Sequence, residues 1–203
     1  MPLLLILFFF AQSCEKEMAR MDDFFLEFAT VDRNSDDLFF VLDNQRRLTP
    51  ISLPGFSAES GQRVVINFTP IKGDSVKVNS VAGIFTGEIK KSNNINDSLV
   101  VDPVKIQSVW VGGNYLNLIF EFEYYESDHT IGLIRDETAN ETDLNLYFFH
   151  SKNDDKPGYF RKTYASFLLT SLASDDGAPI KFTFHINTLT GVNTYSLEYE
   201  PYL

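Results

Sequence analysis

The chain has 203 residues, of which 44% are hydrophobic, and a formal net charge of −11 at pH 7. This acidity argues against a protein built to hold nucleic acid, because phosphate contacts require clustered Lys and Arg, and against adhesion to an anionic membrane surface. The chain has one cysteine, so an intramolecular disulfide is excluded and stability must come from packed apolar cores.

The first predicted element is a secretory signal. Residues 3–10 form an apolar run that is too short to span a bilayer, which takes about 20 residues, but suits the core of a signal peptide. Ser13 precedes Cys14, and a charged cluster follows. The pattern resembles a bacterial lipoprotein signal, with residues 1–13 as leader, Cys14 as the acylated residue and residues 14–21 as a tether. The alternatives are a plain secretory signal with an incidental cysteine, or a buried N-terminal strand.

Residues 22–91 predict a five-stranded barrel of the OB type. Short segments of alternating apolar and polar residues are separated by Asn-, Asp-, Gly- and Pro-containing turns, which is typical of small closed barrels. The expected strands are Phe25 to Val31, Leu38 to Leu42, Arg63 to Phe68, Ser75 to Val81 and Ile84 to Ile89. A polar, weakly patterned stretch at residues 92–101 is the expected linker.

Residues 102–203 predict an antiparallel β-sandwich of about seven strands. Between Leu116 and Tyr124, for example, every second side chain is large and apolar, as in a half-buried strand. The expected strands lie near Lys105 to Val111, Leu116 to Tyr125, His129 to Ile134, Leu144 to His150, Tyr164 to Leu169, Ile180 to Asn187 and Thr194 to Glu200. The Gly-rich strand-to-helix joint of a nucleotide-binding α/β fold does not occur.

Several short motifs occur in a characteristic order along both halves. They are residues 42–50 (LDNQRRLTP), 61–68 (GQRVVINF), 77–81 (KVNSV), 102–104 (DPV), 110–117 (WVGGNYLN), 129–131 (HTI) and 148–151 (FFHS), followed by Asp154-Asp155. In this order the chain resembles the NigD-like lipoproteins of gut and oral Gram-negative anaerobes. The resemblance implies an N-terminal OB domain, a C-terminal β-sandwich and an envelope role related to bacteriocin immunity, but no established chemistry.

Few residues are candidates for catalysis. His129, His150 and His185 lack metal-ligand spacing, so no metal or cofactor is expected. His150 with Asp154 and Asp155, and with His129 if the strands pair, is a candidate cation or proton-transfer site. The alternative is a structural histidine beside a polar turn. Because no activated nucleophile accompanies these groups, an enzyme is not expected.

An aromatic pair flanks a glycine-rich turn. Trp110 and Tyr115 enclose Gly112-Gly113-Asn114, an arrangement suited to stacking on a sugar or anchoring a partner protein, unless Trp110 belongs to the core of the sandwich. Ser75 and Ser98 each lie in an Asp-Ser-apolar triplet that resembles the O-glycosylation signal of exported proteins in these bacteria.

Together these features predict a non-enzymatic cell-envelope lipoprotein that binds a protein or peptide and acts in a manner related to bacteriocin immunity. The expected location is the outer membrane, held through the acylated Cys14. A glycan-binding surface lipoprotein is the alternative, and a hydrolase with an unfamiliar β-fold site is the third hypothesis. No nucleic-acid partner is expected.

Overall fold

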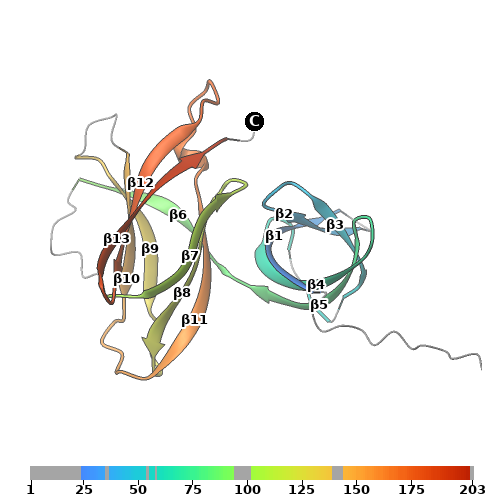
Figure 1. Ribbon diagram of the computed structural model, residues 1–203, viewed down its shortest axis with the longest axis horizontal. Coiled ribbons are helices and arrows are strands. Elements are labelled where there is room, and N and C mark those ends of the chain that lie inside the picture. The colour runs from blue at the N-terminus through green and yellow to red at the C-terminus, as the bar shows by residue number, and fades with distance from the viewer. Residues whose placement is uncertain are drawn as a thin grey trace, which may run out of the picture.

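The computed structural model describes residues 24–34, 37–53, 55–57, 59–93, 102–138 and 144–201. In this part of the chain the fold is all-β, with a closed five-stranded barrel beside an eight-stranded sheet (Figure 1). One three-residue 3-10 helix, η1 (Thr170–Leu172), interrupts the strands. The predicted fold class, an OB-type barrel followed by a β-sandwich, is confirmed.

The barrel occupies the N-terminal part of the described chain. Its strands are β1 (Phe25–Arg33), β2 (Leu38–Leu42), β3 (Arg47–Ser52), β4 (Arg63–Lys72) and β5 (Ser75–Gly83). They close in the order β1-β2-β3-β5-β4, with β4 pairing back onto β1. Alternate side chains point inward, so Val31, Phe40, Leu48 and Ile66 are almost completely buried in one core.

The predicted fifth barrel strand is wrong. The structure uses β3 in its place, and β6 (Phe85–Ser92), which contains most of the predicted segment Ile84 to Ile89, joins the other sheet. Pro50 and the mostly exposed side chains of β3 weaken its alternating pattern. β6 pairs in parallel with β9 and β11, and such distant partners are not specified by the local sequence.

The second sheet contains the remaining strands. They are β6, β7 (Lys105–Gly112), β8 (Tyr115–Tyr124), β9 (Thr130–Asp136), β10 (Asn145–Ser151), β11 (Tyr159–Leu168), β12 (Ile180–Thr188) and β13 (Gly191–Tyr199). Their order is β13-β12-β10-β9-β6-β11-β8-β7. The sheet is therefore mixed and eight-stranded, rather than antiparallel with about seven strands, because β6 is inserted in parallel and β10 pairs in parallel with β12.

This sheet curls so that its two halves face each other and form the sandwich (Figure 1). The space between them is filled by aromatic and aliphatic side chains. Phe148 meets Phe120 edge-on with ring centroids 5.1 Å apart, and it meets Phe167 at 6.1 Å. Each such buried side chain contributes roughly 1.5–3 kcal/mol, so this core is the main source of stability in a domain without disulfides.

A buried polar network joins the barrel to the sandwich. Arg63 at the start of β4 is 2% exposed, and its Nη2 donates to Asp43 Oδ1 at 2.8 Å and to Asn117 Oδ1 at 3.0 Å. Its Nε donates to Ser166 Oγ at 3.4 Å. Asn117 Nδ2 donates to Asp43 Oδ2 at 2.9 Å. Because a buried guanidinium is costly unless it is paired, these contacts hold the two bodies in one arrangement.

Aromatic side chains surround this network. The ring of Phe28 in β1 meets Trp110 of β7 edge-on at 4.9 Å and Tyr164 of β11 at 5.9 Å. The Arg63 guanidinium lies 4.3 Å from the ring centroid of Tyr115. Apolar packing from both bodies thus encloses the polar contacts and strengthens them by excluding water.

Candidate functional site

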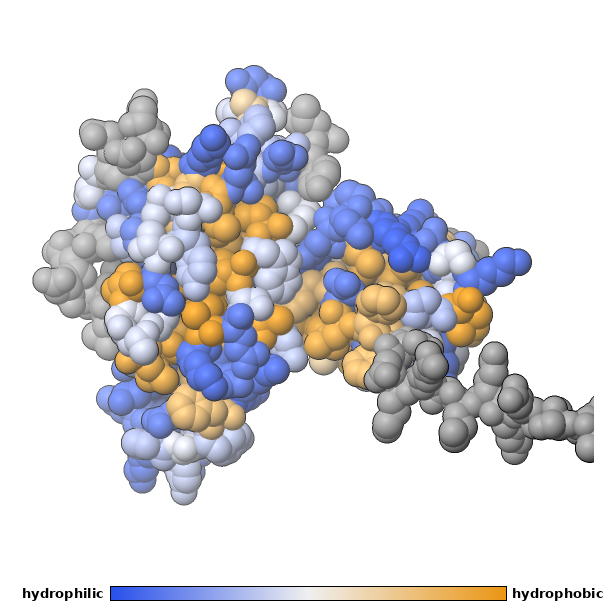
Figure 2. Space-filling view, in the orientation of Figure 1, coloured by the Kyte–Doolittle hydropathy of each residue, from blue (hydrophilic) through white to orange (hydrophobic). Residues whose placement is uncertain are grey.

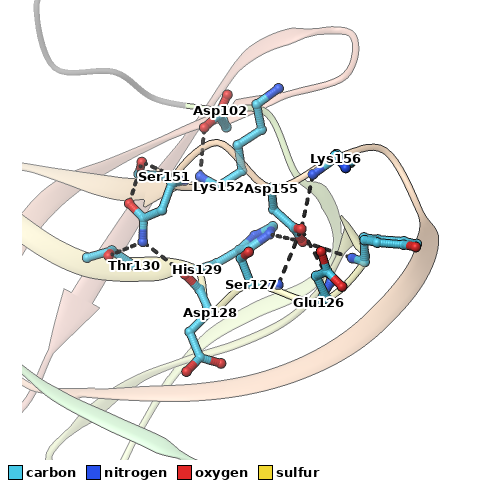
Figure 3. A network of polar contacts seen from close by, with 12 residues as sticks. Asp102, Glu126, Ser127, Asp128, His129, Thr130, Ser151, Lys152, Asp155 and Lys156 are labelled. Carbon is cyan, nitrogen blue, oxygen red and sulfur yellow. Dashed lines mark hydrogen bonds and ion pairs between the residues drawn. The ribbon is translucent and has the colours of Figure 1, made fainter.

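Two histidines and one aspartate meet at one end of the sandwich. His129, in the loop between β8 and β9, places Nδ1 2.9 Å from Nε2 of His150 near the end of β10. On the other side of the ring, His129 Nε2 lies 3.2 Å from Asp155 Oδ2 (Figure 3). The structure therefore brings together three of the predicted candidate residues. We call His129, His150 and Asp155 the histidine site.

Asp155 fixes the loop that carries His129. Its carboxylate accepts backbone N–H groups from Tyr125 at 2.8 Å, Glu126 at 3.3 Å, Ser127 at 3.3 Å and Lys156 at 3.0 Å (Figure 3). Burial opposes ionisation of this carboxyl, but the backbone donors together with His129 outweigh it and hold the pKa well below its usual range. Asp155 is therefore an anion that organises the turn.

Asp154 points elsewhere. It is exposed, and its backbone has φ 66°, a left-handed conformation that Asp tolerates better than most residues. The preceding Asn153 also has positive φ and donates from Nδ2 to the Asp128 carbonyl and to Thr130 Oγ1. The pair Asp154-Asp155 thus divides into a solvent-facing turn residue and a buried member of the histidine site.

The hydrogen bonds of the histidine site define how many protons it holds. His150 Nδ1 lies 3.0 Å from the carbonyl oxygen of Asp102, so it must donate. Three contacts then run from this carbonyl through the two imidazoles to the Asp155 carboxylate, and each needs one proton. Two neutral imidazoles carry two protons, so the complete set forms only when the pair holds one more.

His150 resists further protonation. Burial lowers the pKa of its imidazole, and the neighbouring His129 lowers it further, while the backbone and carboxylate of Asp102 oppose the shift. Phe122 covers both rings, with centroids 4.4 Å from His129 and 5.0 Å from His150. The two rings are therefore held in a fixed position between Phe122 and the anionic Asp155.

A small pocket opens beside the histidines. It encloses about 130 Å³ and is lined by Asp102, Pro103, Glu123, His129, His150, Lys152, Phe160 and Leu189. Phe160 and Leu189 are among the most exposed large apolar side chains of the described chain, together with Tyr125 and Tyr159 at the neighbouring strand ends. We call these four residues, Tyr125, Tyr159, Phe160 and Leu189, the aromatic rim.

Hydroxyl groups do not take part in the histidine site. Among the described residues, no serine, threonine or tyrosine hydroxyl hydrogen-bonds to His129 or His150. A group of three or more residues able to hold a metal ion is likewise not found in the described part of the chain. The site offers two imidazoles fixed beside a carboxylate, a small pocket and an apolar edge.

Trp110 and Tyr115 lie at the domain junction. The Trp110 indole packs against Phe28, and its Nε1 donates to Asp43 Oδ2 at 3.2 Å. Gly112 is needed beside it, because a Cβ at this position would lie 2.5 Å from Asp43 Oδ2. Trp110 therefore packs between the barrel and the sandwich, because its N–H is bonded to Asp43 and its ring contacts Phe28.

The remaining predicted residues are dispersed. His185 on β12 contacts Asn145 and Thr194 and stacks on Tyr147, with a pKa lowered by burial. Ser75 begins β5 on the barrel. Cys14 and Ser98 lie outside the described residues, so lipidation and the second glycosylation signal stay predictions.

Sequence reasoning missed the residues that join the domains. Arg63, Asp43 and Asn117 were not candidate site residues, although all three fall within the motifs that carry the family resemblance. A signal was present in Arg63, a lone cation that begins the apolar segment Arg-Val-Val-Ile, since a charged residue in a buried strand requires a partner.

The fold defines a two-domain β protein, a barrel beside a sandwich, with the histidine site at one end of the sandwich. The family model of the NigD-like C-terminal beta sandwich domain matches residues 87–199, and the chain therefore belongs to the NigD-like family. The NigD-like family is not a known enzyme family. No helix in the described residues is long and apolar enough to cross a membrane.

Solved structures share the whole two-domain arrangement. A putative toxin-related protein from Parabacteroides distasonis has 28% identity and a TM-score of 0.76, with 88% of this chain and 94% of that chain covered. A NigD-like immunity protein from Bacteroides caccae has 26% identity and a TM-score of 0.72, with coverage of 88% and 97%. A putative lipoprotein from Bacteroides fragilis shares the fold at 15% identity and a TM-score of 0.65, with coverage of 89% and 100%. Among curated proteins, no sequence matches the chain.

Proposed function

We propose that this chain is a lipid-anchored protein of the cell envelope that binds a protein or peptide partner through the aromatic rim and acts in an immunity-like role. The observation that carries the proposal is the exposure of four large side chains around the histidine site, with Tyr159 62% exposed and Leu189 58% exposed. Large exposed aromatic groups concentrate at protein interfaces, where they supply much of the binding energy.

Strand pairing and a backbone hydrogen bond hold the residues of the aromatic rim in place. Tyr159 and Phe160 lie in β11, where they pair with Tyr124 and Glu123 of β8. Tyr125 is held through its backbone N–H by Asp155. A partner that docks on such a preformed surface loses little free energy in ordering it, which favours a binding role for this end of the sandwich.

Charge complements the apolar contacts. Glu123, Lys152 and Asp102 border the same pocket as Phe160, so a partner meets both signs of charge around an apolar centre. Polar groups at the border of an apolar contact select among partners. The relatives named as an immunity protein and as a toxin-related protein support a partner that is itself a secreted protein or peptide.

The anchoring part of the proposal depends on Cys14. In native cells, metabolic labelling with a palmitate analogue is expected to mark the unmodified chain and not Cys14→Ser. Protease treatment of intact cells then reports the side of the membrane: degradation without lysis indicates the cell surface, whereas protection until lysis indicates the periplasm. Absence of label from the unmodified chain would contradict anchoring.

The binding part is tested by photo-crosslinking in the same cells. A benzophenone amino acid at position 160 is expected to give a discrete crosslinked product with one partner. The same amino acid at position 71, an exposed apolar site on the barrel, is the control. Equal products from both positions, or none from position 160, would contradict a partner site at the rim.

A further inference from the structure

The large apolar side chains exposed by the barrel share one end of it. Phe25 pairs with Phe68 of β4, and its ring stacks on Phe68 at 5.7 Å. Pro70 of β4 and Pro50 of β3 both pair with Val76 at the start of β5, and an isoleucine directly follows each proline. Among the described barrel residues, the large apolar side chains that are at least half exposed are Phe24, Phe25, Leu26, Ile51 and Ile71. We call these five the apolar end of the barrel.

Three of these residues are consecutive: Phe24 directly precedes β1, and Phe25 and Leu26 begin it. Neighbouring side chains of a strand point to opposite faces, so one of Phe24, Phe25 and Leu26 would ordinarily be sheltered. Here all three are exposed, at 53%, 51% and 52%, because β1 pairs with β2 only from Ala29 onward. The beginning of β1 therefore projects beyond β2 and presents apolar groups on both sides. Figure 2 shows apolar surface on the lower side of the barrel.

Basic residues gather at the same end. Lys77 pairs with Thr69, next to Phe68, and Lys72 pairs with Ser75 at the tip of the β4–β5 hairpin. Both lysines are exposed, and neither forms an ion pair with a described residue. The acidic neighbour Asp74 is paired with Arg46 at 2.7 Å. In a chain of net charge −11, Lys72 and Lys77 thus supply positive charge at this end, where the exposed Glu27 also follows Leu26.

The chain leading to Cys14 leaves from this end. Phe24 is the tenth residue after Cys14, and ten residues span at most about 36 Å when fully extended. An acylated Cys14 would thus hold the apolar end within a short distance of the bilayer. Exposed Phe, Leu and Ile beside Lys match the chemistry of the membrane interface, where apolar groups enter the acyl boundary and ammonium groups contact lipid phosphates.

We infer that the apolar end of the barrel is a membrane-contact surface: Phe24, Leu26 and their apolar neighbours insert shallowly into the bilayer while Lys72 and Lys77 contact anionic headgroups. This inference rests on the lipid anchor of the proposed function. It supplies the second membrane signal that stabilises an acyl anchor, and it makes the barrel a platform that carries the sandwich and its aromatic rim.

The test uses the mature chain from Cys14 onward with Cys14→Ser, so that acylation is absent. It is mixed with phosphatidylcholine vesicles that either contain or lack phosphatidylglycerol. The Cys14→Ser chain with its apolar end otherwise unmodified is expected to cosediment with the vesicles, and more of it when phosphatidylglycerol is present. Phe24→Ser with Leu26→Ser is expected to weaken binding at least about tenfold, and Lys72→Ser with Lys77→Ser to abolish the preference for phosphatidylglycerol. Phe25 is kept, since it packs on Phe68.

The control is Val192→Ser, which alters an apolar side chain of the sandwich that is at least as exposed as Phe24 and Leu26, and it is expected to leave vesicle binding unchanged. Thermal melts verify that each variant is folded. Absence of cosedimentation by the chain with its apolar end unmodified, or an equal loss in the control variant, would overturn the inference. Self-association that depends on Phe24 and Leu26, without vesicle binding, would also overturn it. Failure of palmitate labelling in cells would refute the anchor alone, because vesicle binding is measured without acylation.

Discussion

The guanidinium of Arg63 in the barrel donates to the side-chain oxygen of Asn117 in the sandwich at 3.0 Å, with Arg63 2% exposed and Asn117 fully buried. Asn117 returns a hydrogen bond to Asp43, which also holds Arg63. The loop after β2, the start of β4 and the first turn-proximal residues of β8 are thereby tied together. These bonds explain how a barrel and a sandwich, each with its own core, keep one relative orientation.

Arg63→Met should destabilise the protein by about 3 kcal/mol, because Asp43 and Asn117 lose their cation in a largely buried site. Urea unfolding followed by the fluorescence of Trp110, the sole tryptophan, measures the loss at the junction. The control is Arg46→Met, whose partner Asp74 is exposed and whose loss should cost less than about 1 kcal/mol. A similar loss of unfolding free energy in both variants would show that the Arg63 network does not hold the barrel and the sandwich together.

Gly112→Ala should separate the two bodies by steric conflict. The added Cβ would lie 2.5 Å from Asp43 Oδ2 and 2.7 Å from Asp43 Cβ, so the Asp43 loop must move and release Trp110 and Arg63. We expect about 2–4 kcal/mol of destabilisation and a red shift of Trp110 emission. Gly55→Ala is the control, since nothing lies within 4 Å of its added Cβ; a loss as large there would refute the steric explanation.

Neighbouring aspartates allow a second matched comparison. Asp155→Asn keeps the size of the side chain but removes the charge opposite His129 and one acceptor needed by four backbone N–H groups. We expect a melting temperature lower by several degrees and weaker partner binding at the aromatic rim. Asp154→Asn should change neither property, because Asp154 is exposed and Asn also tolerates its positive φ. Differential scanning calorimetry checks both variants.

Acid should weaken the fold through its buried histidines. The pKa values of His150 and His185 are lowered in the folded state, chiefly by burial, so at intermediate pH the unfolded chain binds more protons. The contribution of these histidines to stability is therefore complete above the histidine pKa of the unfolded chain, about 6.5. It decreases as the pH falls below that pKa. His150→Gln, which retains a donor and an acceptor, should flatten this decline when unfolding free energies are compared between about pH 7.5 and 5. An unchanged slope would contradict the assignment.

The all-β class and most strands follow from period-two alternation, which is clear wherever one face is buried, as in β8. The strands that escape this pattern are defined by distant partners. β6 lies between β9 and β11 in parallel, and β3 closes the barrel through a few pairs despite Pro50. Local residues carry no information about such pairings, so one strand was assigned to the wrong sheet and another was missed.

The candidate site was predictable in part. His129, His150 and Asp155 were chosen for their chemistry and prove to be in contact, because β9 and β10 pair as antiparallel neighbours. The role of Trp110 could not be decided from sequence, since packing against Phe28 and bonding to Asp43 depend on how two domains meet. The aromatic rim could not be predicted from the sequence either, because the exposure of Tyr159 and Phe160 depends on which parts of the strands the fold leaves uncovered.

The most direct test of the proposed function is protection of living cells. A native strain that lacks this gene is challenged with supernatants of bacteriocin-producing relatives. Survival is compared after complementation with the unmodified chain, with Tyr159→Ser plus Phe160→Ser, and with Lys181→Ser plus Glu198→Ser, which changes exposed side chains of β12 and β13. The account predicts that the unmodified chain and the β12–β13 variant protect against at least one supernatant, whereas the rim variant, present at the same level, does not. Equal protection by all three, or by none of them across the supernatants, would contradict it.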